Sequence, residues 1–169
     1  MCIRDSYEGT TAIQANDLVF RKTIRDNGAA VNSLLDEIDS EMTALMNHQN
    51  PKIVSAAENI VEANNTARNV AAHILGGANT PRRPATSGSN YLMLLGTLCG
   101  GWLMTRSGAA AADALAKGEN GAVGNDDFMT IKLTTMQIYM THHLPKISSL
   151  ARTITDGDGA ALAMQPDWL

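Results

Sequence analysis

The sequence predicts an all-α fold, an antiparallel bundle of about five helices, and three observations support this. Apolar residues recur at intervals of three and four over most of the region 11–155. The hydrophobic share is 44% but the aromatic share is only 4%, so the core must be built from Ala, Leu, Ile, Val and Met, which favours closely packed helices. No strand-like alternation is sustained along the chain, and no repeat of 20–50 residues stands out.

Length and charge limit the classes of protein to which the chain can belong. Its 169 residues are about one ordinary domain, enough to bury roughly 70% of the surface of the unfolded chain. There are 13 basic and 17 acidic residues, for a net charge of -4, and the basic residues form no stripe with interleaved aromatics. A nucleic-acid partner is therefore not expected.

The apolar stretches and the cysteines bear on location. The longest near-apolar stretch, 91–104, is too short for the roughly 20 residues that span a bilayer, so no membrane span is expected. Cys2 and Cys99 form neither a metal spacing nor a disulfide framework. This usage is typical of a reducing compartment and predicts a cytoplasmic protein.

The first half of the chain contains three predicted helices. The first spans 11–25 and begins with Thr11 and Gln14 at the spacing of a capping box. The second spans 29–47 and has one apolar and one charged face. The third begins at Asn50-Pro51, an N-cap followed by a proline at the first helical position, and ends at Gly76-Gly77. Its apolar stripe of residues spaced by seven suits a long antiparallel bundle and comprises Ile53, Ile60, Ala67 and Ile74, with Ala57, Ala63 and Ala71 beside them.

Two loops and two helices are predicted in the second half. Residues 76–90 contain paired glycines and two prolines and are expected to form a long loop. The fourth helix spans 91–117, and a second loop spans 118–125. The fifth helix follows and reaches about residue 155.

The fifth helix has further predicted features. The acidic and amide residues at 125–127 should cap it, and Pro145 should kink or divide it after His143. Its apolar face is expected to contain Phe128, Ile131, Thr135, Ile138, His142 and Leu150. The tail 157–169 is expected to be irregular because it is polar and glycine-rich at its start.

Glu8 is the residue that matters most for chemistry. It stands before Gly9, which permits close approach of a ligand, and before the start of a helix, whose free N–H groups can hold an anion or polarise a carbonyl. On composition alone, a simpler explanation stands beside this one, because an acidic residue ahead of a helix also opposes the helix macrodipole.

A family resemblance favours the chemical interpretation. Residues 7–19, with the sequence YEGTTAIQANDLV, are followed by Arg21-Lys22. This segment closely resembles the catalytic C-terminal signature of the acyl-CoA dehydrogenases, above all that of the long bacterial members similar to methylthiopropanoyl-CoA dehydrogenase. Residues 91–106 and 128–150 resemble the helical extension of those members. Phe20 departs from the pattern, since family members often have glycine there.

The resemblance implies a role for each residue of the motif. Glu8 would be the base that removes the α-proton of an acyl-CoA thioester while a hydride passes from the β-carbon to FAD. Gly9 would lie against the substrate, and Thr10 and Thr11 would contact the FAD. The resemblance also implies an acceptor of the electron-transfer flavoprotein type and a homo-oligomeric enzyme.

The resemblance divides the chain into three parts. Residues 1–6 look like a translated adapter and are expected to be a non-native leader. Residues 7–27 would be the end of the dehydrogenase's C-terminal helical domain, and residues 28–169 would be a C-terminal helical extension domain. The chain is then expected to be a C-terminal fragment, inactive alone because the flavin-binding β-domain is missing. The alternative is a non-catalytic helical packing or oligomerisation module.

The remaining histidines and the arginine pair do not predict a specific site. His142 and His143 are adjacent and would point about 100° apart on a helix, so they are not a metal pair, and no metal site is expected. Arg82 and Arg83, in the expected loop, could meet a CoA phosphate, but an ordinary solvated loop explains them as well.

Overall fold

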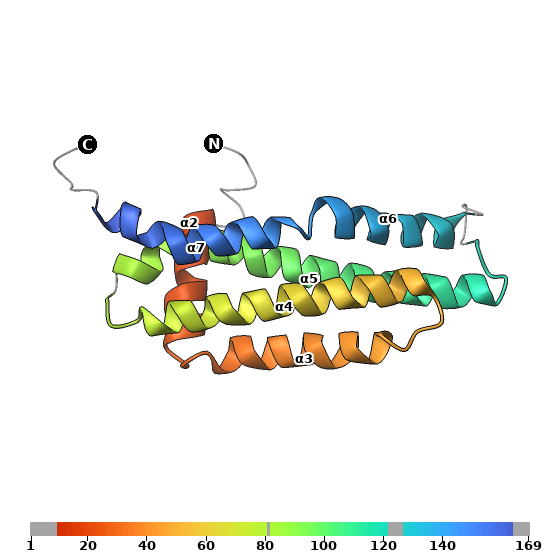
Figure 1. Cartoon of the computed structure of the whole chain (residues 1–169), viewed down its shortest axis with the longest axis horizontal. Coiled ribbons are helices and arrows are strands. Elements are labelled where there is room, and N and C mark those ends of the chain that lie inside the picture. Colours follow the sequence, from red (N-terminus) through yellow and green to blue (C-terminus); the bar gives the residue numbers. More distant parts are fainter. Residues whose placement is uncertain (1–9, 81, 122–126, 164–169) are drawn as a thin grey trace.

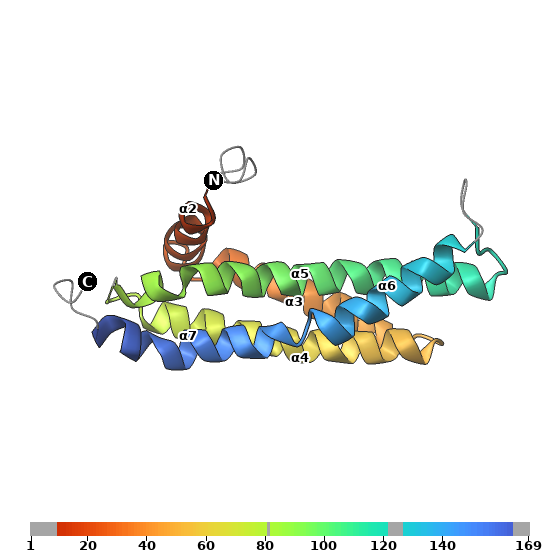
Figure 2. The same cartoon turned by 90° about the horizontal axis from the view of Figure 1, so that it is seen from above.

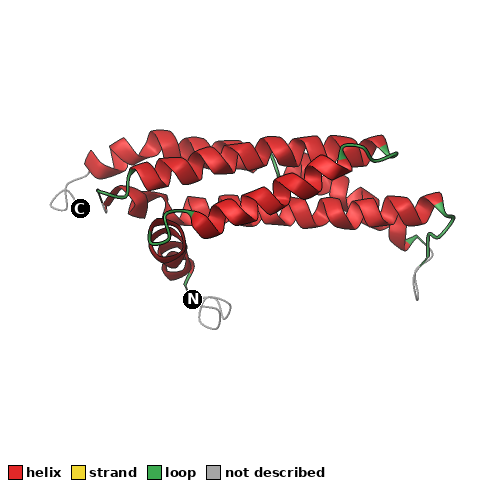
Figure 3. Ribbon diagram, turned by 90° about the horizontal axis from the view of Figure 1, so that it is seen from below, coloured by secondary structure: helices red, strands yellow, loops and turns green. Residues whose placement is uncertain are grey.

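The computed structural model describes residues 10–80, 82–121 and 127–163, and all regular structure within them is helical (Figure 3). The all-α prediction is confirmed. The elements are α2 (Thr11–Asn16), the π-helix η1 (Asp17–Ile24), α3 (Ala29–Leu45), α4 (Pro51–Gly76), α5 (Arg82–Ala116), α6 (Phe128–His142) and α7 (Lys146–Ala163). No helix in these ranges is long and apolar enough to cross a bilayer.

The bundle is an antiparallel arrangement of long helices. Figure 1 shows α3, α4 and α5 running back and forth, with α6 and α7 following one another along the side of α5 and α4. The segment formed by α2 and η1 does not join the bundle lengthwise. It crosses the helices at one end and projects to one side (Figure 2).

Helix α4 forms as the sequence predicts. The Asn50 side chain accepts a hydrogen bond of 3.0 Å from the backbone N–H of Lys52, and Pro51 is the first helical residue. All seven residues of the predicted stripe are less than 9% exposed: Ile53, Ala57, Ile60, Ala63, Ala67, Ala71 and Ile74. The stripe meets the buried face of α3, which consists of Val31, Leu35, Ile38 and Met42.

The charged face of α3 is not wholly solvated. Glu41 turns toward α5, where its carboxylate accepts a hydrogen bond from the Trp102 indole N–H and lies 3.5 Å from the Nε of Arg106. The Arg106 guanidinium in turn lies over the Trp102 ring, 5.5 Å from its centroid. A carboxylate on α3 thus joins the two helices.

The predicted long loop 76–90 is wrong, because α5 begins at Arg82. The connection after α4 is therefore short. Pro84 is compatible with this early start because it falls in the first turn of α5, where a backbone N–H has no helical acceptor to lose. Pro84, Ser87 and Gly88 are buried, so packing also holds this turn in place.

The division of the last helix at Pro145 is confirmed, since α6 ends at His142 and α7 begins at Lys146. The expected irregular tail is wrong as far as Ala163, because α7 continues to that residue. Residues 160–163 are three alanines and a leucine, the strongest helix formers, and they outweigh the cost of about 1 kcal/mol for each preceding helical glycine.

The apolar face predicted for the fifth helix is also wrong in part. Ile131 and Ile138 are 49% and 51% exposed. The side that packs carries Leu133, Met136 and Met140, and continues in α7 with Ile147. The glycines of α5 decide which side packs, because a Cβ at Gly108 would come within 3.1 Å of Met136 Cγ.

The first turn of α6 is capped by a residue that lies several positions before the helix. Asp127 occupies the N-cap position, but its side chain makes no capping hydrogen bond; Asn125 and Asp126 lie outside the described residues. Asn120 takes this role. Its backbone oxygen accepts from Met129 N at 3.0 Å, and its side-chain oxygen accepts from Thr130 N at 3.1 Å.

Candidate functional site

The predicted catalytic motif leads directly into α2. Glu8 and Gly9 lie outside the described residues, and Thr10 and Thr11 are the first motif residues that the structure describes. Thr10 has an extended backbone (φ -75°, ψ 143°) and is the N-cap of α2. Its Oγ1 accepts a hydrogen bond of 3.4 Å from Ile13 N.

The capping box predicted between Thr11 and Gln14 is therefore wrong by one residue. Thr11 is already inside the helix, and an N-cap needs the non-helical backbone that Thr10 has. Thr11 is exposed on the first turn, so its hydroxyl is accessible to a ligand. Thr10 and Thr11, the first described residues of the motif, therefore lie next to each other at the N-terminal end of α2.

The motif helix has one buried side and one exposed side. Ala15, Val19 and Thr23 recur every four residues and are each no more than 1% exposed. Ile13, by contrast, is 64% exposed, and Thr11 and Ala12 are exposed beside it. The buried side faces the bundle, and Thr11, Ala12 and Ile13 lie on the side exposed to solvent.

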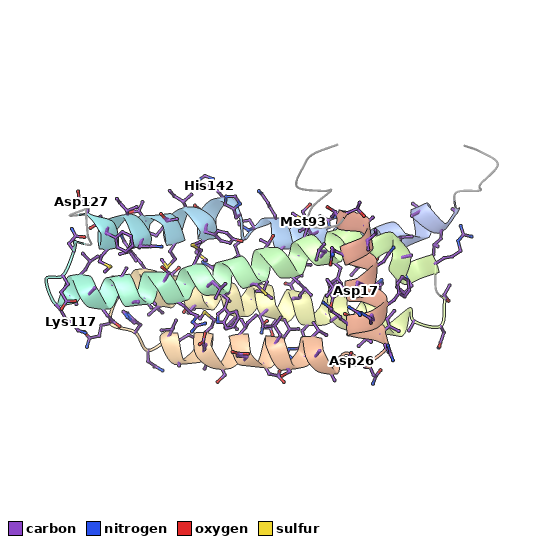
Figure 4. All side chains as sticks on the ribbon, turned by 180° about the vertical axis from the view of Figure 1, so that it is seen from behind. Asp17, Asp26, Met93, Lys117, Asp127 and His142 are labelled. Carbon is purple, nitrogen blue, oxygen red and sulfur yellow. The ribbon has the colours of Figure 1, made fainter. Side chains whose placement is uncertain are left out.

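The buried side packs on the first turns of α5. A Cβ built on Gly88 would lie 3.4 Å from the Cβ of Ala15 and 3.6 Å from its carbonyl carbon. Further along, the Thr23 hydroxyl lies 3.4 Å from the hydroxyl of Tyr91, which is fully buried. In Figure 4, Asp17 and Asp26 mark the course of this crosswise segment.

The second half of the motif helix is wider than an α-helix. In η1 the hydrogen bonds run from N–H to the carbonyl five residues back, as in that from Arg25 N to Phe20 O at 3.1 Å. The Thr23 hydroxyl also donates to the carbonyl of Leu18, five residues back, at 2.9 Å. Sequence periodicity alone did not reveal this π-segment, although such segments often occur at functional sites.

The charges on the outer side of η1 belong to the surface. Asp17 Oδ1 lies 2.5 Å from Arg21 Nε, and Asp17 Oδ2 lies 3.5 Å from Lys22 Nζ. The hydrogen bond from Arg21 and the positive charges of both residues hold the pKa of Asp17 below its ordinary value of 3.8. These contacts order the helix surface and leave no unpaired carboxylate there.

His48 and Asp113 form the pair that most resembles a catalytic dyad among the described residues. Their Nε2 and Oδ1 atoms are 3.1 Å apart. However, His48 Nδ1 accepts a hydrogen bond of 2.9 Å from the backbone N–H of Asn50. Both ring nitrogens are thus occupied, and the pair fastens the loop before α4 to the end of α5 rather than presenting a free base.

Metal-binding groups do not gather in the described part of the chain. No set of three His, Cys, Asp or Glu side chains in residues 10–80, 82–121 and 127–163 could hold a metal ion. His142 and His143 are exposed at the end of α6. Arg82 is exposed on the first turn of α5.

One groove on the bundle lies away from the motif. It has a volume of about 310 Å³, opens between α4 and α6, and is crossed by a 3.3 Å hydrogen bond from Lys52 Nζ to Gln137 Oε1. It lies toward the start of α4, whereas the motif helix crosses the bundle near the end of α4 (Figure 1). Its location at the other end of α4 therefore separates this groove from Thr10 and Thr11.

Comparison with known proteins identifies the family of the helical region. The family described as acetyl-CoA dehydrogenase C-terminal like matches residues 34–165, and the chain belongs to this family. The matched region covers α4 to α7 completely and most of α3, whereas α2 and η1 lie before it.

Two curated relatives extend the similarity to most of the chain. One is the 3-methylmercaptopropionyl-CoA dehydrogenase of Ruegeria pomeroyi, 37% identical over 163 residues, which are 93% of this chain and 26% of the relative. Another is the broad-specificity linear acyl-CoA dehydrogenase FadE5 of Mycobacterium tuberculosis, 31% identical over 156 residues, which are 88% of this chain and 25% of the relative. The chain spans about a quarter of the length of these relatives.

Proposed function

We propose that this chain is the C-terminal part of an FAD-dependent acyl-CoA dehydrogenase, which introduces an α,β double bond into an acyl-CoA thioester. The observation that carries the proposal is the order of two features in one chain. The motif at residues 7–19 resembles the catalytic signature, and a region matched by the dehydrogenase C-terminal family follows at 34–165.

In this proposal Glu8 is the base. Its carboxylate takes the α-proton of the thioester, and the acidity of that proton depends on stabilising the negative charge that develops on the carbonyl oxygen. Backbone N–H groups near a helix start are suitable donors for such an oxygen. Gly9, which has no side chain, allows the substrate to approach the backbone.

Thr10 and Thr11 are the residues proposed to contact FAD. The exposure of Thr11 on the first turn of α2 supports this, because its hydroxyl can reach a bound group without rearrangement of the helix. The described residues thus fit a flavin contact. When bound, FAD supplies the acceptor for the hydride that leaves the β-carbon.

The proposed substrate is an acyl-CoA, with methylthiopropanoyl-CoA as the specific candidate. The relative from Ruegeria pomeroyi, whose name includes 3-methylmercaptopropionyl-CoA, supports this candidate. The other relative has linear acyl-CoA substrates in its name, so a direct comparison of kcat/KM for the two thioester classes would decide between them. We further propose an electron-transfer flavoprotein-type acceptor, a homo-oligomeric enzyme and a cytoplasmic location.

The proposed domain division places residues 7–27 at the end of the dehydrogenase's helical domain and residues 28–169 in an extension domain. The start of the family match at residue 34 supports a boundary near this point. The crosswise direction of α2 and η1 relative to the bundle also supports it (Figure 2).

The Glu8→Gln variant of the complete enzyme tests the proposed role. We expect it to retain bound FAD but to lose flavin reduction by acyl-CoA in anaerobic stopped-flow measurements, because an amide cannot take the proton. Glu37→Gln, at an exposed position on α3, is the matched control and should reduce at the normal rate. Flavin reduction at the normal rate in Glu8→Gln would rule out the role.

A non-catalytic packing or oligomerisation module is the second candidate. The exposure of Ile131 and Ile138 on α6 favours it, because exposed isoleucines seven residues apart lie on one face of a helix and suit a protein contact. Loss of flavin reduction in Glu8→Gln would reject this candidate as the sole function. Persistent association of the chain without any flavin chemistry in the complete protein would support it.

A further inference from the structure

The motif helix is held in place by α5. Ala15 and Thr23, eight residues apart on α2 and η1, each meet a residue of α5 and are no more than 1% exposed. Their partners, Gly88 and Tyr91, are three residues apart and so lie on one face of α5. Two separate contacts can fix both the position and the rotation of the motif helix.

The first contact is a close crossing of the two helices. A Cβ at Gly88 would be in van der Waals contact with the Cβ and the carbonyl carbon of Ala15, at 3.4 and 3.6 Å, so little room is left on this side for a longer side chain. The nearest atoms include backbone, which cannot turn aside as a flexible side chain can. An alanine at position 88 would be in ordinary contact with Ala15, whereas the longer, branched side chain of leucine would push α2 away from α5.

The second contact is a buried pair of hydroxyl groups. The Thr23 hydroxyl donates to Leu18 O at 2.9 Å and has only one proton, so Tyr91 must be the donor in the 3.4 Å contact between the two hydroxyls. Burial raises the pKa of Tyr91 above its ordinary value of 10.0, which keeps this proton in place. Tyr91 therefore contacts η1 at Thr23, the residue whose hydroxyl also bonds to the carbonyl of Leu18.

These contacts bear on chemistry because the helix continues directly from the motif. Glu8 is two residues before Thr10, the N-cap of α2. A shift of α2 therefore displaces Thr10, the described residue of the motif that is nearest to Glu8 in the sequence. A misplacement of about 1 Å at a reacting group can cost on the order of 100-fold in rate.

We infer that Gly88 and Tyr91 are positioning residues, through which the C-terminal bundle holds α2, and with it the Thr10 end of the motif, in place for the proposed reaction. This inference rests on the function proposed above. It gives the helical extension a part in the reaction: the bundle that follows the motif holds the motif helix at a fixed distance and rotation.

Substitution of leucine at two glycines of α5 in the complete enzyme tests the inference. Gly88→Leu should lower the rate constant of flavin reduction about 100-fold at saturating acyl-CoA, while FAD content and KM change by less than about threefold. Gly96→Leu is the matched control on the same helix, because a Cβ at Gly96 has no described atom within 4 Å. It should reduce at the normal rate.

A milder variant decides the matter if Gly88→Leu fails to fold or loses its flavin. Tyr91→Phe removes one hydroxyl and keeps the ring, and should slow flavin reduction about three- to tenfold, in line with the loss of one neutral hydrogen bond. The double variant Thr23→Val with Tyr91→Phe should be no slower than the slower of its two single variants, because both changes remove the same contact.

The outcomes separate this inference from the proposed function. If Glu8→Gln abolishes flavin reduction while Tyr91→Phe and a folded Gly88→Leu reduce at the normal rate, the positioning role is overturned and the base remains assigned. If a slowed variant instead shows a raised KM and an unchanged rate at saturation, the two residues act on substrate binding and the inference is likewise wrong. If Glu8→Gln reduces normally, the proposed function itself fails.

Discussion

The phenol ring of Tyr139 on α6 lies directly over Gly100 on α5. A Cβ at Gly100 would clash with the Tyr139 hydroxyl and come within 2.9 Å of its Cζ. The same hydroxyl donates a hydrogen bond of 3.0 Å to the carbonyl of Thr97, one turn earlier on α5. A glycine and a tyrosine together therefore set how closely these two helices approach.

We expect Gly100→Ala to destabilise the chain by about 1–3 kcal/mol, the usual cost of inserting atoms into a packed contact. Tyr139 would have to move, and its hydrogen bond to Thr97 would break. The free energy of unfolding in urea measures the effect. Adding Tyr139→Leu, which shortens the side chain, should recover part of the loss that Gly100→Ala causes.

Gly96→Ala is the matched control, one turn away on the same helix. A Cβ there meets no described atom within 4 Å, so only helix propensity changes and the chain should gain up to about 1 kcal/mol. Equal effects of the two alanine substitutions would contradict the packing assigned to Gly100.

The glycines also explain what the sequence could and could not predict about the fold. The stripe of Ile53 and Ile60 identified the core face of α4, because only one side of that helix is apolar. In α6 both sides carry apolar residues, so periodicity could not choose between Ile131 and Met136. That choice depends on glycines of another helix, which no pattern within α6 contains.

The candidate site shows the same limit. The motif and its helix could be predicted from local residues, whereas the N-cap differed by one position because Thr10 and Thr11 have the same side chain and differ in backbone conformation. The contact of Gly88 with Ala15 was missed because position 88 fell in an expected loop. Pro84 was a signal for the earlier helix start, since proline is tolerated in a first turn.

Asn64 provides a second prediction. It is fully buried on α4, and its side-chain amide donates to the carbonyl of Leu35 on α3 at 2.8 Å, while its Oδ1 has no hydrogen-bond partner among the described residues. Asn64→Leu, of similar size, should change the free energy of unfolding by less than about 1.5 kcal/mol, because it also removes the unsatisfied oxygen.

Asn64→Asp should behave differently from the leucine variant. It replaces a donor with a buried carboxylate and should cost about 3 kcal/mol or more at pH 7. The introduced carboxyl would have a raised pKa, so stability should return as the pH falls and be lost as it rises through that pKa. Urea unfolding at pH 4 to 8 checks both variants, and a pH-independent loss in Asn64→Asp would contradict the assigned burial.

The tautomer of His48 is a third prediction. Because Asn50 N–H can only donate, His48 Nδ1 must accept, and the ring proton must lie on Nε2 facing Asp113. Nitrogen NMR shifts of the neutral ring should show the Nε2–H form. Asp113→Asn keeps an acceptor oxygen and should preserve this tautomer, whereas a majority of the Nδ1–H form in the native chain would contradict the hydrogen bonds described.

The last prediction concerns alkaline pH and Tyr91. Burial is the main cause that raises its pKa above 10.0, and the negative charge of Asp26 adds to it. A raised pKa means that the folded state keeps the proton longer than the unfolded state. The stability that depends on this proton is therefore fully present below pH 10.0 and is lost as the pH rises through the raised pKa.

Tyr91→Phe separates this alkaline effect from the hydrogen bond itself. Near pH 8 it should destabilise the chain by about 1 kcal/mol, because it leaves the Thr23 oxygen with one hydrogen-bond donor fewer. As the pH rises toward 11, the difference from the native chain should shrink, since phenylalanine has no proton to lose. Tyr139→Phe, at a half-buried tyrosine whose pKa is also raised by burial, should show a smaller alkaline change. Urea unfolding at pH 8 to 11 measures all three chains. A stability difference for Tyr91→Phe that stays constant over this range would show that the Tyr91 hydroxyl ionises as readily in the folded as in the unfolded chain.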